Sequence, residues 1–487
     1  MRNKYKNQLK NIDKEIIEEL KKLPLDYWDF KNEDTKELTH GIHTYPAVMV
    51  YPISRNIIKI VKKYQEVNVF MDPFMGSGTC LVEGILAGMD EVYGTDLNPL
   101  ARLISKVKTT HLHYEDVRNA IDKIEEKINR IYNKYESILD NIYSYLNEKS
   151  IDITEKATVK DGWGHNAPSI LREYMTKNNI NLYIPEFKNL GFWFVPNAIL
   201  ELQIIKNNIL EIDNDDIRDF VWIAFSEVTR LVSNRRNSEF KMYRMPAEKV
   251  VNFRPDVKKE FFKILERNAD KMHNFYDICD DKTKETKVHI FNNDTRYLKD
   301  IPDNYIDLVV TSPPYGDSRT TVAYGEFSRL SLQWVNLEEL SDKEITGIDK
   351  NLMGGTKFAK GFEYDLYSNT LKESLDKILE CDKNIERAGD VYSFYKDLQK
   401  AIESITKKCK KNSYQFWVVG NRTVKNETLK TSDIIIEMAE KFGLEHVYTI
   451  GRNISNKVMP SLNSPTNEVG KKVTTMTNEH IVILRKR

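Results

Sequence analysis

Two short segments near the start of the chain have residue types that could bind a nucleoside. The apolar run at 67–71 leads into Asp72-Pro73-Phe74-Met75-Gly76-Ser77-Gly78-Thr79, and a helical pattern follows. Gly accepts positive φ and has no Cβ, so Gly76 and Gly78 would let backbone N–H groups approach a ligand closely. Asp96 ends the next strand, about twenty residues on, where an acidic side chain can accept hydrogen bonds from ribose hydroxyls. Because no Lys follows Gly78, a nucleoside is favoured over a nucleoside triphosphate.

A second turn, Ser312-Pro313-Pro314-Tyr315, has groups that could hold an amine for methyl transfer. It follows the apolar run at 306–310, and two prolines cannot continue a sheet because each lacks an N–H and has a fixed φ. Ligands of open α/β sheets bind at the carboxyl ends of strands, so this turn should face the ligand of the glycine turn. There the Ser312 hydroxyl and the Pro313 carbonyl could accept the N–H bonds of a base amino group while Tyr315 stacks on the ring. Such acceptors would hold the nitrogen for attack on a methyl sulfonium.

The segments around both turns alternate between strand and helix patterns, which predicts an α/β fold. The expected strands cover residues 67–71, 91–95, 288–291, 306–310, 414–419, 446–450 and 479–484. The expected helices cover residues 9–23, 99–104, 216–232, 394–409 and 432–442. Between residues 111 and 287 apolar residues recur at helical spacing, most clearly over 117–142, which predicts a large, mostly helical insertion. Within it, two glycines and a proline at 161–168 predict a loop.

Composition excludes several classes of protein. The 487 residues carry 73 basic and 73 acidic side chains, so any surface that binds nucleic acid must be local. No apolar run approaches the ~20 residues that a membrane span needs, and the charged N-terminus has no signal-peptide core, which predicts a cytoplasmic protein without membrane contact. The cysteines are far apart and should be free thiols, with neither a disulfide framework nor a metal site; they are Cys80, Cys279, Cys381 and Cys409.

The motifs resemble those of the amino-methylating DNA methyltransferases, the cytosine-N4 and adenine-N6 family. The segment from Asp72 to Thr79 is similar to the family's cofactor motif, Asp96 to its ribose-binding acid, and Ser312-Pro313-Pro314-Tyr315 to its catalytic motif. The segment His43-Thr44-Tyr45-Pro46-Ala47 resembles the one beside the methionine end of the cofactor, and Asn293-Asp294 resembles the position that contacts the adenine.

This resemblance implies a Rossmann-like sheet that binds S-adenosyl-L-methionine and double-stranded DNA with a flipped target base. The implied cofactor-binding residues are Tyr45, Asp72, Phe74, Gly76, Gly78, Thr79, Asp96, Asn98 and Asp294. The implied catalytic residues are Ser312, Pro313, Pro314 and Tyr315. In the family, Ser at the first position of the catalytic motif indicates methylation of cytosine N4. The resemblance also implies a restriction-modification context, with a possible cognate restriction endonuclease as partner. Cytosine C5 methylation would need a Pro-Cys motif, which the chain lacks.

These motifs divide the chain into five expected regions. Residues 1–110 form an N-terminal helix and the cofactor half of the catalytic domain, and residues 288–339 form the half with the catalytic turn. The insertion at 111–287 is a candidate DNA-recognition region, although the family pattern places an insertion directly before the catalytic motif. Residues 340–390 are a candidate recognition loop or lid, and residues 391–487 complete the catalytic domain.

A local basic segment is the best candidate for DNA contact. Arg and Asn suit guanine and adenine edges, and the candidates are Arg235, Arg236, Lys241 and Arg244, together with Arg319 and Tyr324 after the catalytic turn. Three alternatives stay open: a DNA adenine-N6 methyltransferase, an RNA base-amine methyltransferase, and a DNA-binding protein that has lost the chemistry.

Overall fold

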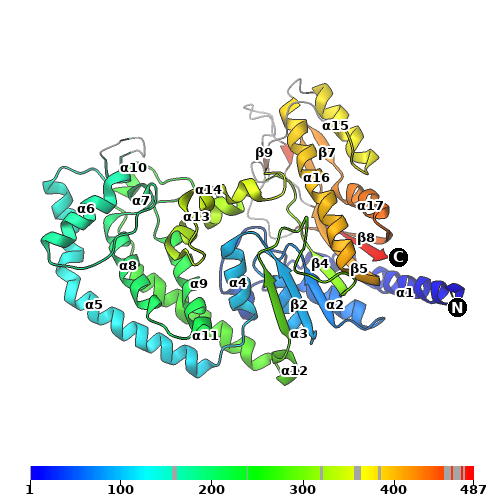
Figure 1. The fold of residues 1–487 in the computed structure, drawn as a ribbon, viewed down its shortest axis with the longest axis horizontal. Coiled ribbons are helices and arrows are strands. Elements are labelled where there is room, and N and C mark those ends of the chain that lie inside the picture. The colour runs from blue at the N-terminus through cyan, green and yellow to red at the C-terminus, as the bar shows by residue number, and fades with distance from the viewer. Residues whose placement is uncertain are drawn as a thin grey trace.

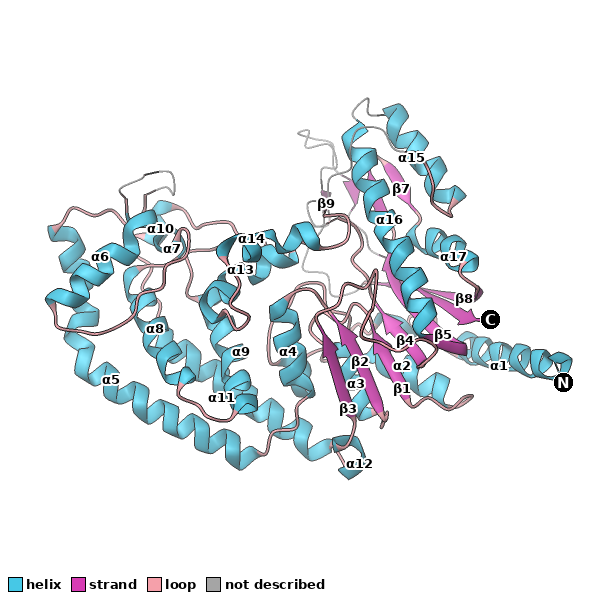
Figure 2. Cartoon of the chain, viewed as in Figure 1, coloured by secondary structure: helices cyan, strands magenta, loops and turns pink. Residues whose placement is uncertain are grey.

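A seven-stranded, mostly parallel sheet forms the centre of the molecule (Figures 1 and 2). The computed structural model describes residues 2–155, 159, 162–237, 240–317, 322–355, 363–381, 385–454, 462–463, 473–474 and 478–487. The strand order is β3-β2-β1-β4-β5-β11-β8. The strands are β1 (Val69–Asp72), β2 (Glu91–Thr95), β3 (Lys287–Phe291), β4 (Ile306–Thr311), β5 (Cys409–Gly420), β8 (Leu444–Asn453) and β11 (Asn478–Lys486). Only β11 is antiparallel to its neighbours, and this order is compatible with a Rossmann-like methyltransferase.

Helices cover both faces of the sheet, so its central strands are buried on both sides and read as continuous apolar runs. On one face lie α2 (Tyr51–Lys62), α3 (Thr79–Leu86) and α4 (Pro99–Thr109), which pack over Phe70 of β1. On the other lie α16 (Ile385–Lys408) and α17 (Thr431–Lys441), which pack over Met71. Adjacent residues of one strand therefore enter two separate cores.

The insertion between α4 and β3 is helical and lies to the left of the sheet in Figure 1. It contains α5 (Tyr114–Glu148), α6 (Trp163–Lys177), α7 (Leu190–Trp193), α8 (Pro196–Leu210), α9 (Asp215–Leu231), α10 (Ala247–Val250), α11 (Val257–Ile278) and α12 (Asp281–Lys284). The 35-residue α5 confirms the helical stripe read from the sequence.

The prediction of a loop at 161–168 is wrong from Trp163 onward, because α6 begins at Trp163 and Pro168 lies inside this helix. Trp163, Leu171 and Tyr174 are buried on one face of α6. The free energy gained by burying this face exceeds the cost of the backbone hydrogen bond that Pro168 cannot donate. Tertiary packing therefore overrides the low helix propensity of proline here.

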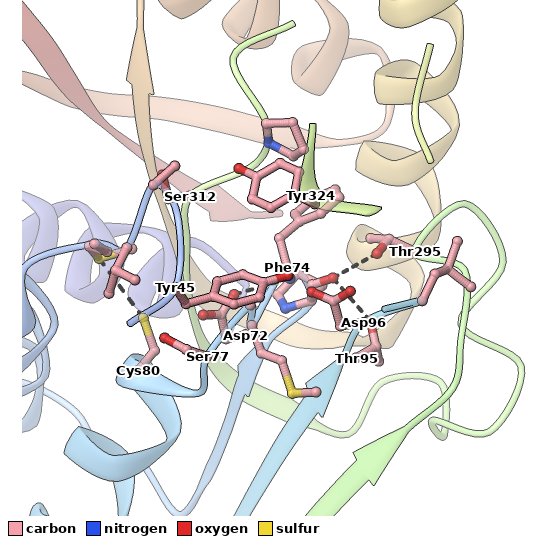
Figure 3. A pocket seen from close by; sticks show the side chains of 18 of the residues that line it. Tyr45, Asp72, Phe74, Ser77, Cys80, Thr95, Asp96, Thr295, Ser312 and Tyr324 are labelled. Carbon is pink, nitrogen blue, oxygen red and sulfur yellow. Dashed lines mark hydrogen bonds between the residues drawn. The ribbon is translucent and has the colours of Figure 1, made fainter. Parts of the chain in front are cut away.

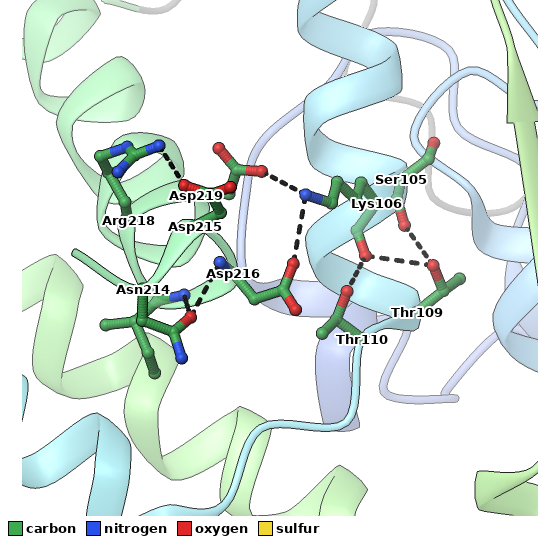
Figure 4. Close-up of polar contacts among 10 residues, drawn as sticks. Ser105, Lys106, Thr109, Thr110, Asn214, Asp215, Asp216, Arg218 and Asp219 are labelled. Carbon is green, nitrogen blue, oxygen red and sulfur yellow. Dashed lines mark hydrogen bonds and ion pairs between the residues drawn. The ribbon is translucent and has the colours of Figure 1, made fainter. Parts of the chain in front are cut away.

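The insertion is fixed to the sheet layer by packing and by a small charge cluster. Trp334 of α13 (Tyr324–Val335) makes an edge contact with Phe225 of α9. Figure 4 shows Lys106 of α4 reaching Asp216 and Asp219 of α9, with Nζ–carboxylate distances of 3.1 and 2.7 Å. These contacts hold the insertion beside α4, the helix that follows the ribose-binding candidate Asp96.

The remaining elements surround this frame. They are α1 (Arg2–Lys22), η1 (Tyr27–Asp29), η2 (Leu38–Gly41), α14 (Asp342–Asn351), α15 (Asn369–Cys381), the hairpin β6 (Arg422–Val424) and β7 (Glu427–Leu429), and the pair β9 (Leu462–Asn463) and β10 (Val473–Thr474). Cys80, Cys279 and Cys409 are buried free thiols; the side chain of Cys381 lies outside the described residues. In the described part of the chain, none of the helices has the length and apolar character needed to cross a bilayer.

Candidate active site

A pocket of about 870 Å³, counting its open part, lies at the carboxyl ends of β1, β2 and β4. Its wall includes the residues from Asp72 to Ser77, together with Thr79, Asp96, Asp294, Ser312 and Pro314. Figure 3 shows Ser77 and Cys80 at one end, Asp96 and Thr295 at the other, and Ser312 and Tyr324 above. The two turns singled out in the sequence, 235 residues apart, therefore open into one cavity.

The glycine turn after β1 is held in a conformation that suits glycine. Gly76 has φ +48° and Gly78, the residue before α3, has φ +74°. A Cβ on Gly78 would lie 2.8 Å from the Ser105 hydroxyl, which donates to the carbonyl of Gly76 at 2.9 Å. A larger residue at position 78 would thus meet both backbone strain and a steric clash.

A buried carboxylate, Asp72, and a half-buried one, Asp96, flank this turn and have different partners. Asp72 accepts the Thr311 hydroxyl at 2.7 Å and the Phe74 N–H at 3.1 Å, which ties the glycine turn to the residue before Ser312. Asp96 accepts the Asn98 N–H at 2.8 Å and forms part of the pocket wall. Burial raises the pKa of each carboxyl to about 6. Asp72 therefore links the two turns, and both carboxylates line the pocket.

Tyr45 and Tyr324 form an aromatic wall of the pocket. Their ring centroids lie 6.0 Å apart in a stacked arrangement, and burial raises the pKa of Tyr45 well above its ordinary value. Asn98 lies behind this wall, where its side-chain amide donates to the Tyr45 hydroxyl at 3.1 Å and to Ser328 at 2.7 Å. Asn98 thus supports Tyr45 and caps α4, and Tyr324, a DNA candidate in the sequence, lies in the pocket wall.

Asp294 lines the pocket but is already engaged by a cation. Both of its carboxylate oxygens accept Arg296 Nε at 2.9 Å, and Arg296 also pairs with Asp397 of α16 at 2.9 Å. The Thr295 hydroxyl donates to the Pro73 carbonyl at 2.6 Å, so this loop is fixed to the glycine turn. Leu352 and Met353, which follow α14, complete the wall; sequence reasoning missed both because they are apolar and distant in the chain.

The Ser-Pro-Pro-Tyr turn is anchored to the last strands of the sheet. The Ser312 hydroxyl donates to the Val418 carbonyl at 3.0 Å and lies 3.3 Å from the Tyr315 hydroxyl. The Tyr315 hydroxyl donates to Glu479 of β11 at 2.8 Å, and burial beside this carboxylate raises the pKa of Tyr315 well above its ordinary value. Glu479 has no signal in the sequence, because strand pairing alone brings it to this turn.

Directly after the turn, Asp317 is fully buried between two arginines. Its carboxylate lies 3.3 Å from Arg387 of α16 and 3.0 Å from Arg422 of β6. These ion pairs fix the exit of the Ser-Pro-Pro-Tyr turn against the α16 side of the sheet. The candidate Arg319 lies outside the described residues.

The basic candidates of the insertion divide into two groups. Arg235 donates to the Arg230 carbonyl at 3.1 Å, and burial lowers its pKa to about 10. Arg244 donates to the carbonyls of Thr154, Ile153 and Phe192 at 2.8 to 3.0 Å. Both guanidinium groups therefore contribute to the fold of the insertion, whereas the side chain of Arg236 is exposed and that of Lys241 half-exposed.

Comparison with known proteins assigns the family. The type II methyltransferase M.MvaI of Kocuria varians is 39% identical over 489 residues, which cover 98% of each chain. The chain belongs to the type II methyltransferases. As such it is a DNA methyltransferase, and enzymes of this family use S-adenosyl-L-methionine. A second type II methyltransferase, M.MjaII of Methanocaldococcus jannaschii, is 21% identical over 363 residues, 65% of each chain. No family model matches the chain.

Proposed function

We propose that this type II methyltransferase is site-specific and transfers the methyl group of S-adenosyl-L-methionine to the exocyclic N4 of cytosine in double-stranded DNA. The observation that carries the proposal is the single pocket in which Asp96 and the glycine turn meet Ser312 and Pro314. The site suits both a nucleoside cofactor and a planar base with an amino group.

The pocket residues fit the cofactor. The Thr79 hydroxyl is buried at the amino end of α3 and has no hydrogen-bond partner among the described residues, so it is available to a ligand. Asp96 would accept hydrogen bonds from the ribose hydroxyls, and the loop of Asp294 would hold the adenine. The cofactor supplies a methyl group on a positively charged sulfur, which an amine can attack without prior activation by a metal.

The catalytic turn would position the amine through acceptor atoms. Because the Ser312 hydroxyl proton points at the Val418 carbonyl, the lone pairs of Ser312 remain for an N–H of the base. The Pro313 carbonyl, which belongs to a residue without an N–H, would accept the other N–H. Two accepted hydrogen bonds orient the nitrogen lone pair and favour the charge that develops on it during transfer.

The target base must leave the duplex to reach this turn. Ser312 is only partly exposed and lies in a pocket wall with Tyr324, so a stacked base could not approach it. The insertion at 111–287 would recognise the DNA, with residues 340–390 as a second recognition segment or lid. A cognate restriction endonuclease with the same recognition sequence would be the functional partner.

Nucleoside analysis tests the proposal. DNA methylated by the protein should contain N4-methylcytosine, and Ser312→Ala should reduce transfer by roughly 10²-fold while the chain stays folded and binds the cofactor. N6-methyladenine as the sole product would overturn the cytosine assignment. Duplex DNA and tRNA offered side by side with labelled cofactor test the acceptor, and transfer to tRNA alone would refute the DNA substrate.

A further inference from the structure

A lysine is buried behind the glycine turn. Lys108, in the last turn of α4, is 1% exposed, and its ammonium donates to the Ser77 hydroxyl at 3.3 Å, its one hydrogen bond among the described residues. A buried ammonium is costly unless an anion compensates it. Burial alone lowers the pKa of Lys108 to about 7, with no carboxylate contributing to the shift.

The buried carboxylate of the adjacent helix α3 is committed elsewhere. Glu83 of α3 is buried, and its carboxylate accepts His40 Nε2 at 2.8 Å and Arg55 Nε at 2.8 Å. The other titratable groups that face Lys108 are His40 and His43, and burial lowers the pKa of both, to about 4 for His43. Neutral imidazoles cannot compensate an ammonium, so the protein itself supplies Lys108 with no counter-ion in the described region.

The Ser77 end of the pocket is built to receive an anion. Ser77 lines the pocket, and the Thr79 hydroxyl beside it is buried without a hydrogen-bond partner among the described residues. Helix α3 begins at Thr79, so its positive amino end lies in the same wall. Figure 3 shows Ser77 at the end opposite Asp96 and Thr295. If Asp96 holds the ribose, the amino-acid end of the cofactor must reach Ser77.

We propose that Lys108 is the buried counter-charge for the carboxylate of the cofactor's methionyl end, acting through the Ser77 hydroxyl. Lys108 donates to Ser77, which donates in turn to the carboxylate, while Thr79 and the amino end of α3 donate directly. Lys108 is therefore a positioning residue, and it makes the site select a cofactor that carries a carboxylate. The inference rests on the proposed function, since it takes S-adenosyl-L-methionine as the ligand.

Calorimetric titration with two ligands tests this inference. S-adenosyl-L-methionine and its decarboxylated analogue share the nucleoside, the sulfonium and the amine, and differ only in the carboxylate. The unmodified protein should bind the intact cofactor at least tenfold more tightly than the analogue. Lys108→Met should reduce this preference by tenfold or more and leave affinity for the analogue unchanged.

Controls separate the charge from packing. Lys108→Gln keeps a polar side chain without the charge and should behave as Lys108→Met does, and Ser77→Ala should also reduce the preference. Lys106→Met removes a half-exposed lysine of the same helix and should leave the preference intact. Equal weakening of both ligands, or an unchanged preference in the Lys108 variants, would overturn the inference. Failure of the unmodified protein to bind either ligand would instead contradict the proposed function.

Discussion

Asp72 and Asp96 are two carboxylates with the same raised pKa and different partners. Asp72 joins β1 to β4 through Thr311, whereas Asp96 accepts the N–H of Asn98, and both residues line the pocket. Asp96 titrates at about pH 6 in the free protein, and only its charged form is a pure acceptor for ribose hydroxyls. Protonation of Asp96 should therefore compete with cofactor binding.

Cofactor affinity should consequently fall as the pH drops below about 6, by at most about tenfold per pH unit for one proton. Above that pH Asp96 is ionised and adds no further dependence. Asp96→Asn should bind more weakly at neutral pH and lose most of the acidic slope. Calorimetric titration of each protein with the cofactor measures these affinities, at pH values from about 5 to about 8 that lie on both sides of the pKa of Asp96. A slope that persists in Asp96→Asn would assign the titration to Asp72.

The buried Lys108 should also affect folding stability in a defined pH window. Its pKa is about 7 in the folded protein and about 10.4 in an unfolded chain. The unfolded state therefore binds more protons between these values, and the free energy of unfolding contributed by this group rises with pH across that window. Chemical denaturation of the cofactor-free protein should show this rise, and Lys108→Met should lack it. A common pH profile for both proteins would contradict the buried position of the ammonium.

At the scale of elements, the glycine turn depends on two residues with positive φ, and at Gly78 a side chain would also clash. Gly78→Ala should lower the free energy of unfolding by roughly 1–3 kcal/mol, because it adds backbone strain and a clash with Ser105. Gly88→Ala is a matched control, with a similar φ of +67° and no atom within 4 Å of the added Cβ. Gly88→Ala should lower the free energy of unfolding by less than Gly78→Ala, since it adds backbone strain without a clash. Denaturant titration measures the free energy of unfolding of both variants. Equal decreases would show that Ser105 moves away from the added Cβ without cost.

The sequence predicts the elements best where pattern and burial agree. The expected strands at 91–95, 306–310 and 414–419 lie within β2, β4 and β5, and the helical stripe over 117–142 lies within α5. The prediction failed at α6, where buried Trp163 sustains a helix through Pro168, and the hairpin β6–β7 was missed because its strands are three residues long. Short elements carry too few residues for a periodic signal.

The candidate site was predictable where backbone chemistry dictates residue type. Gly78 has positive φ, and Pro313 and Pro314 end a buried strand, so both turns are visible in the sequence. Glu479 and Lys108 were not predictable, because only tertiary packing brings them to Tyr315 and Ser77. A charged residue in a sequence does not reveal whether it is buried, as Arg235 also shows.

At the scale of the molecule, a neutral chain must bind a polyanion through a local surface. In the basic segment of the insertion, the Met242 N–H donates to Glu326 of α13 at 2.7 Å, and α13 begins at Tyr324 of the pocket wall. Arg236 and Lys241 lie on this segment with exposed or half-exposed side chains. The segment therefore adjoins the wall past which a flipped base would enter.

Arg236→Ala and Lys241→Ala should each weaken DNA binding and reduce the slope of log affinity against log salt by about 1, as expected for loss of one phosphate contact. Arg130→Ala on the exposed side of α5 is the control and should leave the slope unchanged. Binding to duplex DNA across a salt series measures both quantities. Equal slopes for all variants would place the DNA contact elsewhere.

The helical insertion leaves the sheet layer after α4 and returns at β3, and α4 packs beside β3. Because the insertion leaves and rejoins the sheet layer at neighbouring points, its sequence and length can change without moving the strands that carry the two turns. On the proposal that the insertion recognises the DNA, new recognition sites could evolve by exchange of residues 111–287 alone, while the methyl-transfer chemistry is inherited unchanged. Grafting residues 111–287 from a homologue with a different recognition sequence would thus be a route to engineered site specificity.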